Sequence, residues 1–215
     1  DYKKIIYHTY QQTNMKKQWF AVYILMVVCF AACQSNKKPA SDNADKEFIV
    51  LFTNDIHSQI LPLEDNNMGG ALRRKVVIDS IRVTHDNVLL VDAGDVVQGT
   101  VFFNIFKGEV EMMIMNELGY DVRTLGNHEF DNRMDGLKQM LLWNNRTTTI
   151  ATNYSFSDSA TASLIQKSTI IPVGDIKVGF VSANTNPNGI IDPNYRHGLS
   201  YTDPLELTDN EARKL

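Results

Sequence analysis

The chain has 215 residues, of which 43% are hydrophobic, and this is enough for one domain with a substantial core. Its formal net charge of −4 argues against a nucleic-acid polymer as partner, because proteins that bind one carry a basic face that neutralises phosphates. Both cysteines, Cys29 and Cys33, lie near the N-terminus. Any metal site in the rest of the chain therefore needs histidine, carboxylate, amide or backbone ligands.

The N-terminal residues indicate export from the cytoplasm. Residues 15–32 begin with Met15-Lys16-Lys17 and continue as an uncharged apolar run, which is the pattern of a signal peptide. This run is shorter than the roughly 20 apolar residues of a membrane span. The segment Phe30-Ala31-Ala32-Cys33 resembles the lipobox of bacterial lipoproteins, with phenylalanine in place of the usual leucine. We therefore predict lipidation of Cys33 and a lipid-anchored location in the bacterial cell envelope, periplasmic or surface-exposed; an ordinary cleaved signal and an uncleaved anchor helix are the alternatives.

Two further N-terminal segments are interpreted from composition. Residues 1–14 precede the first methionine and are interpreted as an upstream extension. Residues 33–46 are polar after the cysteine, and such a composition is typical of a flexible tether. The folded domain is predicted over residues 47–215.

Strands and helices are predicted to alternate along this domain. Apolar, β-branched runs predict strands at residues 48–53, 87–91, 121–125 and 147–152. The spacing of apolar residues predicts helices at residues 71–83, 109–118, 134–143 and from 201 to the end of the chain. Two runs around Val173-Gly174-Asp175 predict a hairpin, at residues 168–172 and 176–182. The alternation indicates an α/β fold.

Several side chains are assigned to core or surface. The run at 48–53 is apolar throughout, which predicts a strand covered on both faces. The methionines of the helix at 109–118 are predicted to fill the core rather than to contact a cofactor: Met112, Met113 and Met115. His85 at a helix end and His197 in a loop are predicted to be exposed.

Polar and ionisable side chains follow three of the predicted strands directly. Asp55 and His57 come after the first strand, Asp95 follows a glycine after the second, and Asn127 and His128 follow the third. At a strand end, a spacing of two places side chains on the same side, and ligands of open α/β sheets bind at the carboxyl ends of strands. Each signal alone is weak, because an isolated Asp-x-His is more often a surface turn. Together they predict a site for a hard or borderline divalent ion with mixed oxygen and nitrogen ligands.

These residues resemble a known family. Asp55-x-His57, Gly94-Asp95 and Gly126-Asn127-His128-Glu129 are similar to the first three motifs of the calcineurin-like metallophosphoesterases. The flanking residues, including Gln98-Gly99-Thr100 and Phe130-Asp131, resemble the secreted 5′-nucleotidase and 2′,3′-cyclic phosphodiesterase branch. The resemblance runs from about Phe48 to the C-terminus. It implies a four-layer α/β sandwich, in which two mixed β-sheets are flanked by helices.

The resemblance also implies a role for each residue. Asp55 and His57 would bind a first divalent ion, Asp95 would bridge two ions, and Asn127 would bind the second. His128 would act beside the phosphate as stabiliser or general acid, with Asp131 holding its ring. The two ions (Mn, Zn, Mg or Fe) would polarise the phosphoryl oxygens and activate a bridging water for in-line attack. The expected partner is a nucleotide or another phosphate ester outside the cytoplasm.

One departure from the family pattern concerns later metal ligands. The family also has a histidine on a subsequent strand and a Gly-His-x-His sequence, whereas His197 is the one histidine after Asp131 in this sequence. The resemblance therefore implies that the domain is truncated at its C-terminus and that these 215 residues alone are almost inactive. Two other interpretations stay open at this point: a phosphatase or phosphodiesterase for another exported phosphate ester, and a non-catalytic metal- or ligand-binding lipoprotein. The sequence does not indicate which oligomeric state the protein adopts.

Overall fold

A computed structural model describes residues 47–65 and 67–215. The predicted signal peptide, the lipidation site Cys33 and the tether lie outside the described residues. Within the described part of the chain, no helix is long and apolar enough to cross a membrane.

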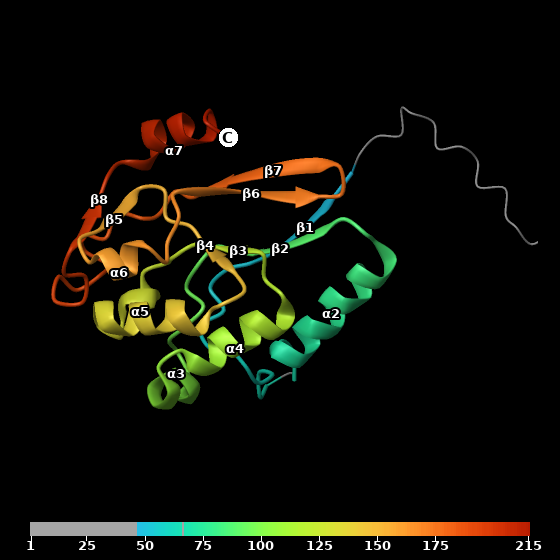
Figure 1. Ribbon diagram of the computed structural model, residues 1–215. Helices are drawn as coiled ribbons and strands as arrows, with labels where there is room; N and C mark the ends of the chain where they lie inside the picture. Colours follow the sequence, from blue (N-terminus) through green and yellow to red (C-terminus); the bar gives the residue numbers. More distant parts are fainter. Residues whose placement is uncertain (1–46, 66) are drawn as a thin grey trace, which may run out of the picture. The chain divides into compact units, whose positions relative to one another are not determined.

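A four-stranded parallel sheet forms the centre of the fold, with its strands in the same order as in the sequence (Figure 1). The strands are β1 (Ile49–Thr53), β2 (Val88–Asp92), β3 (Val122–Arg123) and β4 (Thr148–Thr149). β1 and β2 pair along their whole length, whereas the two shorter strands add two residue pairs each. Because every strand runs the same way, all the carboxyl ends lie at one edge of the sheet.

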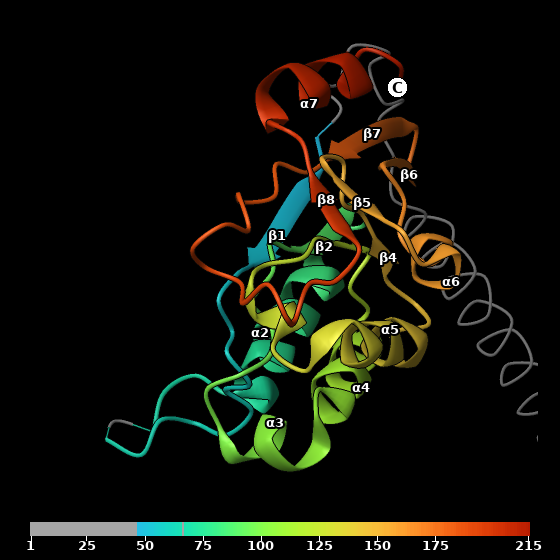
Figure 2. The same cartoon turned by 90° about the vertical axis from the view of Figure 1, so that its left-hand side faces the viewer.

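Three long helices connect these strands and cover one face of the sheet. They are α2 (Ala71–Thr84), α4 (Glu109–Leu118) and α5 (Arg133–Trp143). Right-handed crossovers between strands that follow one another in order place their helices on the same side, and both views show this arrangement (Figures 1 and 2). The core lies between the helices and the sheet, where Leu90 of β2, Met112 of α4 and Leu137 of α5 belong to one buried cluster.

The remaining elements lie outside the parallel sheet. An antiparallel hairpin is formed by β6 (Ser168–Val173) and β7 (Ile176–Val181), as predicted. A second antiparallel pair joins β5 (Tyr154–Phe156) and β8 (Leu199–Tyr201). The other elements are α3 (Val101–Phe106), the 3-10 helix η1 (His128–Phe130), α6 (Ser159–Ala162) and α7 (Pro204–Ala212).

The predicted α/β class is therefore confirmed, with a parallel sheet flanked by helices. Of the two mixed sheets that the family resemblance implies, the described residues form one parallel sheet and two antiparallel pairs. The predicted strands at 121–125 and 147–152 are shorter than expected, because their last residues leave the ladder to form the loops at the sheet edge.

Two burial predictions were wrong. Among the described residues, β1 is covered on one face only: Phe52 is 71% exposed and Val50 is 41% exposed. β1 is an edge strand, and its alternate side chains point away from the helices, so an apolar run does not by itself prove burial on both faces. Met112 and Met115 are buried as predicted, but Met113 lies on the outer side of α4 and is 60% exposed.

The exposure of β1 gives a stability prediction. We expect Phe52→Ala to lower the free energy of unfolding by less than about 1 kcal/mol, because little buried apolar surface is lost. Leu90→Ala on the neighbouring strand, where the side chain is 1% exposed, should cost about 2–5 kcal/mol. Urea denaturation of both variants measures the difference. Equal losses would show that the outer face of β1 is covered.

Candidate metal centre

Three loops meet at the carboxyl edge of the sheet. Residues 54–58 follow β1, residues 93–96 follow β2 and residues 124–128 follow β3. Since these three strands are neighbours in the order β1-β2-β3, the loops are neighbours too. The predicted meeting of the three motifs at one sheet edge follows directly from the strand order.

The first two loops continue the hydrogen bonding of the parallel ladder. The backbone N–H of Asp55 donates to Gly94 O (3.0 Å), and that of His57 donates to Asp95 O (3.0 Å). Asp55, His57 and Asp95 all have φ values near +50°, in the left-handed region that side chains other than glycine rarely adopt. Such strain persists where the surrounding structure imposes it, and it occurs often at functional sites. The left-handed turns, and not strand alternation, therefore bring Asp55 and His57 together.

The second and third loops touch through two glycines. A Cβ on Gly94 would lie 2.4 Å from the backbone nitrogen of Gly126, and a Cβ on Gly126 would lie 2.2 Å from Oδ1 of Asp95. Gly94 also has φ of +102°. Glycine at both positions is thus required for the backbones to approach this closely.

The site brings together three groups that can bind a metal. His57, Asp95 and His128 each offer one ligand atom, and these atoms lie within 4.8 Å of one another. The two imidazole rings meet edge to face with their centroids 4.9 Å apart. Asp55 adjoins this group, with its Oδ1 3.6 Å from Nε2 of His57.

His128 is held on both sides. Its Nδ1 lies 2.8 Å from Oδ2 of Asp131, and its backbone N–H donates to Oδ1 of Asp95 (2.8 Å). Asp131 therefore fixes the ring orientation and leaves the other ring nitrogen to face a ligand. Asn127 directly precedes η1, between Gly126 and His128, and is half-buried.

This donor set fits a divalent ion. It combines imidazole nitrogens with carboxylate oxygens, and the chemistry of such mixed sites suits Zn, Mn or Fe, or Mg where oxygen ligands predominate. The side chains are half-buried rather than enclosed, so a ligand can approach them from solvent. Together these loops form a candidate metal centre, defined by His57, Asp95 and His128.

Glu129 has a role that sequence reasoning missed. Its side chain is fully buried, and its carboxylate accepts backbone N–H bonds from Gly126 (2.6 Å), Val96 (3.0 Å) and Asp95 (3.1 Å). One carboxylate therefore ties the loop after β2 to the loop after β3. The bonds from Val96 and Asp95 cross between the two loops and resist their separation, whereas the bond from Gly126 fixes Glu129 within its own loop. The sequence signal was a glutamate between polar residues and Phe130, which gives no indication of burial.

A buried polar chain lies beneath the site. The hydroxyl of Thr53 donates to Oδ2 of Asp92 (2.6 Å) and lies 2.8 Å from the hydroxyl of Tyr120. Burial raises the pKa of the Asp92 carboxyl from 3.8 to about 6, although the hydrogen bonds from Thr53 and from the N–H of Gly94 act against this shift. Burial also raises the pKa of Tyr120.

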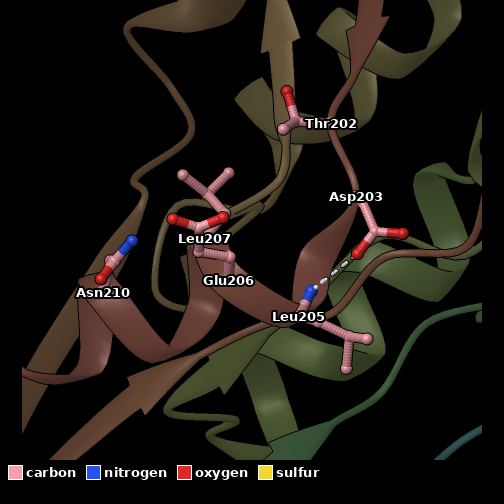
Figure 3. Close-up of a pocket in the computed structure, with 6 residues that line it drawn as sticks. All are labelled: Thr202, Asp203, Leu205, Glu206, Leu207 and Asn210. Atoms are coloured by element: carbon pink, nitrogen blue, oxygen red, sulfur yellow. Dashed lines mark hydrogen bonds between the residues drawn. The ribbon is translucent and has the colours of Figure 1, made fainter.

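Figure 3 shows a separate cavity of about 410 Å³ at the start of α7. Asp203 caps this helix by accepting the N–H of Leu205 (3.1 Å). In the described part of the chain, none of the metal-centre residues lines this cavity; its lining residues are Thr202, Asp203, Leu205, Glu206, Leu207 and Asn210.

A comparison with protein families agrees with this geometry. The model of the calcineurin-like phosphoesterase family matches residues 48–205, which include the β1, β2 and β3 loops. The chain belongs to the calcineurin-like phosphoesterase family. Members of this family are hydrolases of phosphate esters, and the family identity agrees with the three motifs in the sequence.

Several similar relatives within this phosphoesterase family are 5′-nucleotidases. Snake venom 5′-nucleotidase of Crotalus adamanteus is 36% identical over 180 residues, which cover 79% of this chain and 30% of the relative. The 5′-nucleotidase of Homo sapiens is 33% identical over 181 residues, which cover 79% of this chain and 31% of the relative. The predicted resemblance to the 5′-nucleotidase branch is thereby confirmed.

Solved structures share the fold of the chain. The 5′-nucleotidase precursor from Thermus thermophilus has a TM-score of 0.72 at 29% identity, with 77% of this chain and 34% of that chain covered. The NAD nucleotidase NadN of Haemophilus influenzae has a TM-score of 0.69 at 24% identity, with 77% and 31% covered. The chain thus spans about a third of the length of each of these two proteins.

The raised pKa of Asp92 predicts a pH-dependent stability difference. Because the folded-state pKa lies above the ordinary value, the stabilisation from this group is complete below pH 3.8 and is lost as the pH rises through about 6. Asp92→Asn cannot ionise, and its amide can still accept from Gly94 and donate to Thr53. In metal-free protein with chelator present, we expect the free energy of unfolding of the variant, relative to that of the wild type, to rise by roughly 2 kcal/mol between pH 4.5 and pH 8.

Urea denaturation at several pH values checks this expectation. Glu206→Gln is the control, because this side chain is exposed on α7 and away from the sheet edge. A difference between Asp92→Asn and the wild type that stays constant across this pH range would contradict the prediction.

Proposed function

We propose that this chain is the metal-binding part of a 5′-nucleotidase-like hydrolase that releases phosphate from nucleotides outside the cytoplasm. The observation that carries the proposal is the grouping of His57, Asp95 and His128 at one sheet edge. The 5′-nucleotidase relatives favour a nucleotide over other phosphate esters. Lipidation at Cys33 would hold the domain at the cell envelope through residues 33–46.

Two divalent ions are the proposed cofactors. Asp55 and His57 would hold the first, Asp95 would bridge the two, and Asn127 would contribute to the second. Bound ions of this kind polarise phosphoryl oxygens and supply a strong nucleophile from water at neutral pH. The left-handed loops and the Glu129 carboxylate hold these ligands in place before any ion binds, so little reorganisation is needed on binding.

His128 is the proposed proton donor to the leaving oxygen. Asp131 engages its Nδ1 at 2.8 Å, and this contact orients the ring. Charge that develops on the leaving oxygen needs such a donor nearby. His128 also lies within the group that can hold a metal, so a ligand role is the competing assignment. The two roles predict different results for the same His128 variant.

The segment Gln98-Gly99-Thr100, which resembles the 5′-nucleotidase branch, contacts the loop after β1. Thr100 donates from its hydroxyl to Ser58 O (3.0 Å), and Gly99 lies against the backbone of His57. Gln98 and Gly99 both have positive φ values, so this segment turns sharply before α3. We propose that its contribution to the reaction is to hold the turn at His57.

Metal content and turnover separate the proposed roles. Asp95→Asn should lower bound Mn²⁺ at least about tenfold, because it removes a ligand charge shared by both ions. His128→Asn should retain Mn²⁺ and lower the rate of AMP hydrolysis by about 10²–10⁴-fold. Elemental analysis after dialysis measures Mn²⁺ in this chain, and phosphate release is measured in the full-length protein.

His85→Asn, which alters an exposed histidine at the end of α2, is the matched control for both measurements. Loss of Mn²⁺ from His128→Asn would show that His128 is a ligand and not the proton donor. A full-length protein that binds Mn²⁺ but releases no phosphate from AMP would exclude a 5′-nucleotidase. Hydrolysis of p-nitrophenyl phosphate in its place would indicate another phosphate ester.

A further inference from the structure

Asn184 connects the end of β7 with the end of β3. It lies three residues after β7, whose described pairing partner is β6 and not the parallel sheet. Its side chain is nevertheless buried, at 3% exposure, and lies beside Thr124 and Leu125 at the start of the loop after β3. No motif in the sequence pointed to this residue.

The side-chain amide of Asn184 uses both of its donors. Nδ2 donates to the backbone oxygen of Leu125 (2.8 Å) and to the hydroxyl of Thr124 (2.8 Å). That hydroxyl in turn donates to Ile150 O (2.9 Å), so it can only accept from Asn184. Both neighbours are therefore acceptors, and this fixes which end of the amide faces them.

Other buried hydrogen bonds hold Asn184 itself in place. Ser182 donates from its hydroxyl to Oδ1 of Asn184 (2.9 Å). Asn153 accepts the backbone N–H of Asn184 (2.7 Å) and donates from Nδ2 to its backbone oxygen (2.9 Å). With every polar group of Asn184 partnered and water excluded, the side chain has a single defined orientation.

The bond to Leu125 acts on one particular peptide unit. The carbonyl of Leu125 and the N–H of Gly126 belong to the same planar peptide group. Asn184 binds the oxygen of this group, while Oε2 of Glu129 binds its N–H at 2.6 Å. The peptide plane is thus held from opposite sides, and it directly precedes Asn127 and His128.

We propose that Asn184 is a positioning residue that sets the Leu125–Gly126 peptide plane and thereby the placement of Asn127 and His128 for metal binding. This inference rests on the proposed function, because it assumes that the loop after β3 contributes to a metal site. The side-chain hydrogen bonds of Asn184 reach Thr124, Leu125 and Ser182, none of which is a proposed metal ligand. Asn184 acts through the backbone of the loop.

Asn184→Asp is the test variant, because it keeps the shape of the side chain and removes both donors. An aspartate oxygen would face two acceptors. Asn116→Asp is the matched control: Asn116 also donates from Nδ2 to a backbone oxygen, that of Trp143, at 2.8 Å. Asn116 lies near the end of α4, before β3 begins, and so at the edge of the sheet opposite the metal centre.

Two measurements on the full chain report on the proposal. The first is the hydrogen-exchange rate of the Gly126 amide in metal-free protein, followed by NMR, and the second is the Mn²⁺ dissociation constant from calorimetry. In Asn184→Asp we expect exchange at Gly126 to be about tenfold faster or more, since the bond to Glu129 opens more often. Mn²⁺ binding should weaken by about tenfold or more. Asn116→Asp should match the wild type in both.

The outcomes separate the positioning role from the proposed function. Unchanged Gly126 exchange in Asn184→Asp, or faster exchange with unchanged Mn²⁺ affinity, would overturn the positioning role. Failure of the wild-type chain to bind Mn²⁺ would overturn the proposed function, and the Gly126 exchange rates would still decide whether Asn184 holds this peptide. If Asn184→Asp does not fold, Asn184→Ser gives the same two readouts without adding a charge, and the same results are expected in the same directions.

Discussion

The candidate metal centre depends on one buried carboxylate that binds two loops at once. Glu129 accepts three backbone N–H groups, two from the loop after β2 and one from the loop after β3. The Glu129 side chain is fully buried, so its carboxylate supplies the acceptors that these backbone N–H groups need inside the protein. The carboxylate therefore compensates for the close backbone contact at Gly94 and Gly126, and it keeps Asp95 beside His128.

The order of the strands makes this contact possible. In a parallel sheet with the order β1-β2-β3-β4, consecutive loops at the carboxyl edge are spatial neighbours. The backbone of the first loop then bonds to the second, and the second is joined to the third through Glu129. Left-handed turns at Asp55, His57 and Asp95 are held by these bonds, so the strain at the ligands is balanced by the ladder and the carboxylate.

Sequence reasoning recovered the parts of the fold that follow from apolar pattern and motif. Long apolar runs predicted β1, β2, α2, α4 and α5, because burial of a periodic face determines these elements. The short elements β5, β8, α6 and η1 were missed, since each has three or four residues and is stabilised by tertiary contacts rather than by its own pattern. The exposed side of β1 was missed for a related reason: composition does not tell an edge strand from a central one.

At the site, too, sequence reasoning found some residues and missed others. It found the groups that can bind a ligand and missed the groups that hold them in place. Asp55, His57, Asp95 and His128 were predicted because polar and ionisable side chains follow three strands in succession, although each signal alone is weak. Glu129 and Asn184 were not assigned a role, because buried polar residues look like surface residues in a sequence. Their partners are backbone groups up to 59 residues away along the chain, and such contacts exist only once the fold is known.

The most direct test of this account is the position of a metal ion in crystals of the chain grown with Mn²⁺. Anomalous X-ray scattering locates manganese independently of the protein atoms. The account predicts a peak at the carboxyl edge of the sheet, within about 2.0–2.5 Å of a ring nitrogen of His57 and a carboxylate oxygen of Asp95. A peak elsewhere on the protein, with none between the loops after β1 and β2, would contradict it.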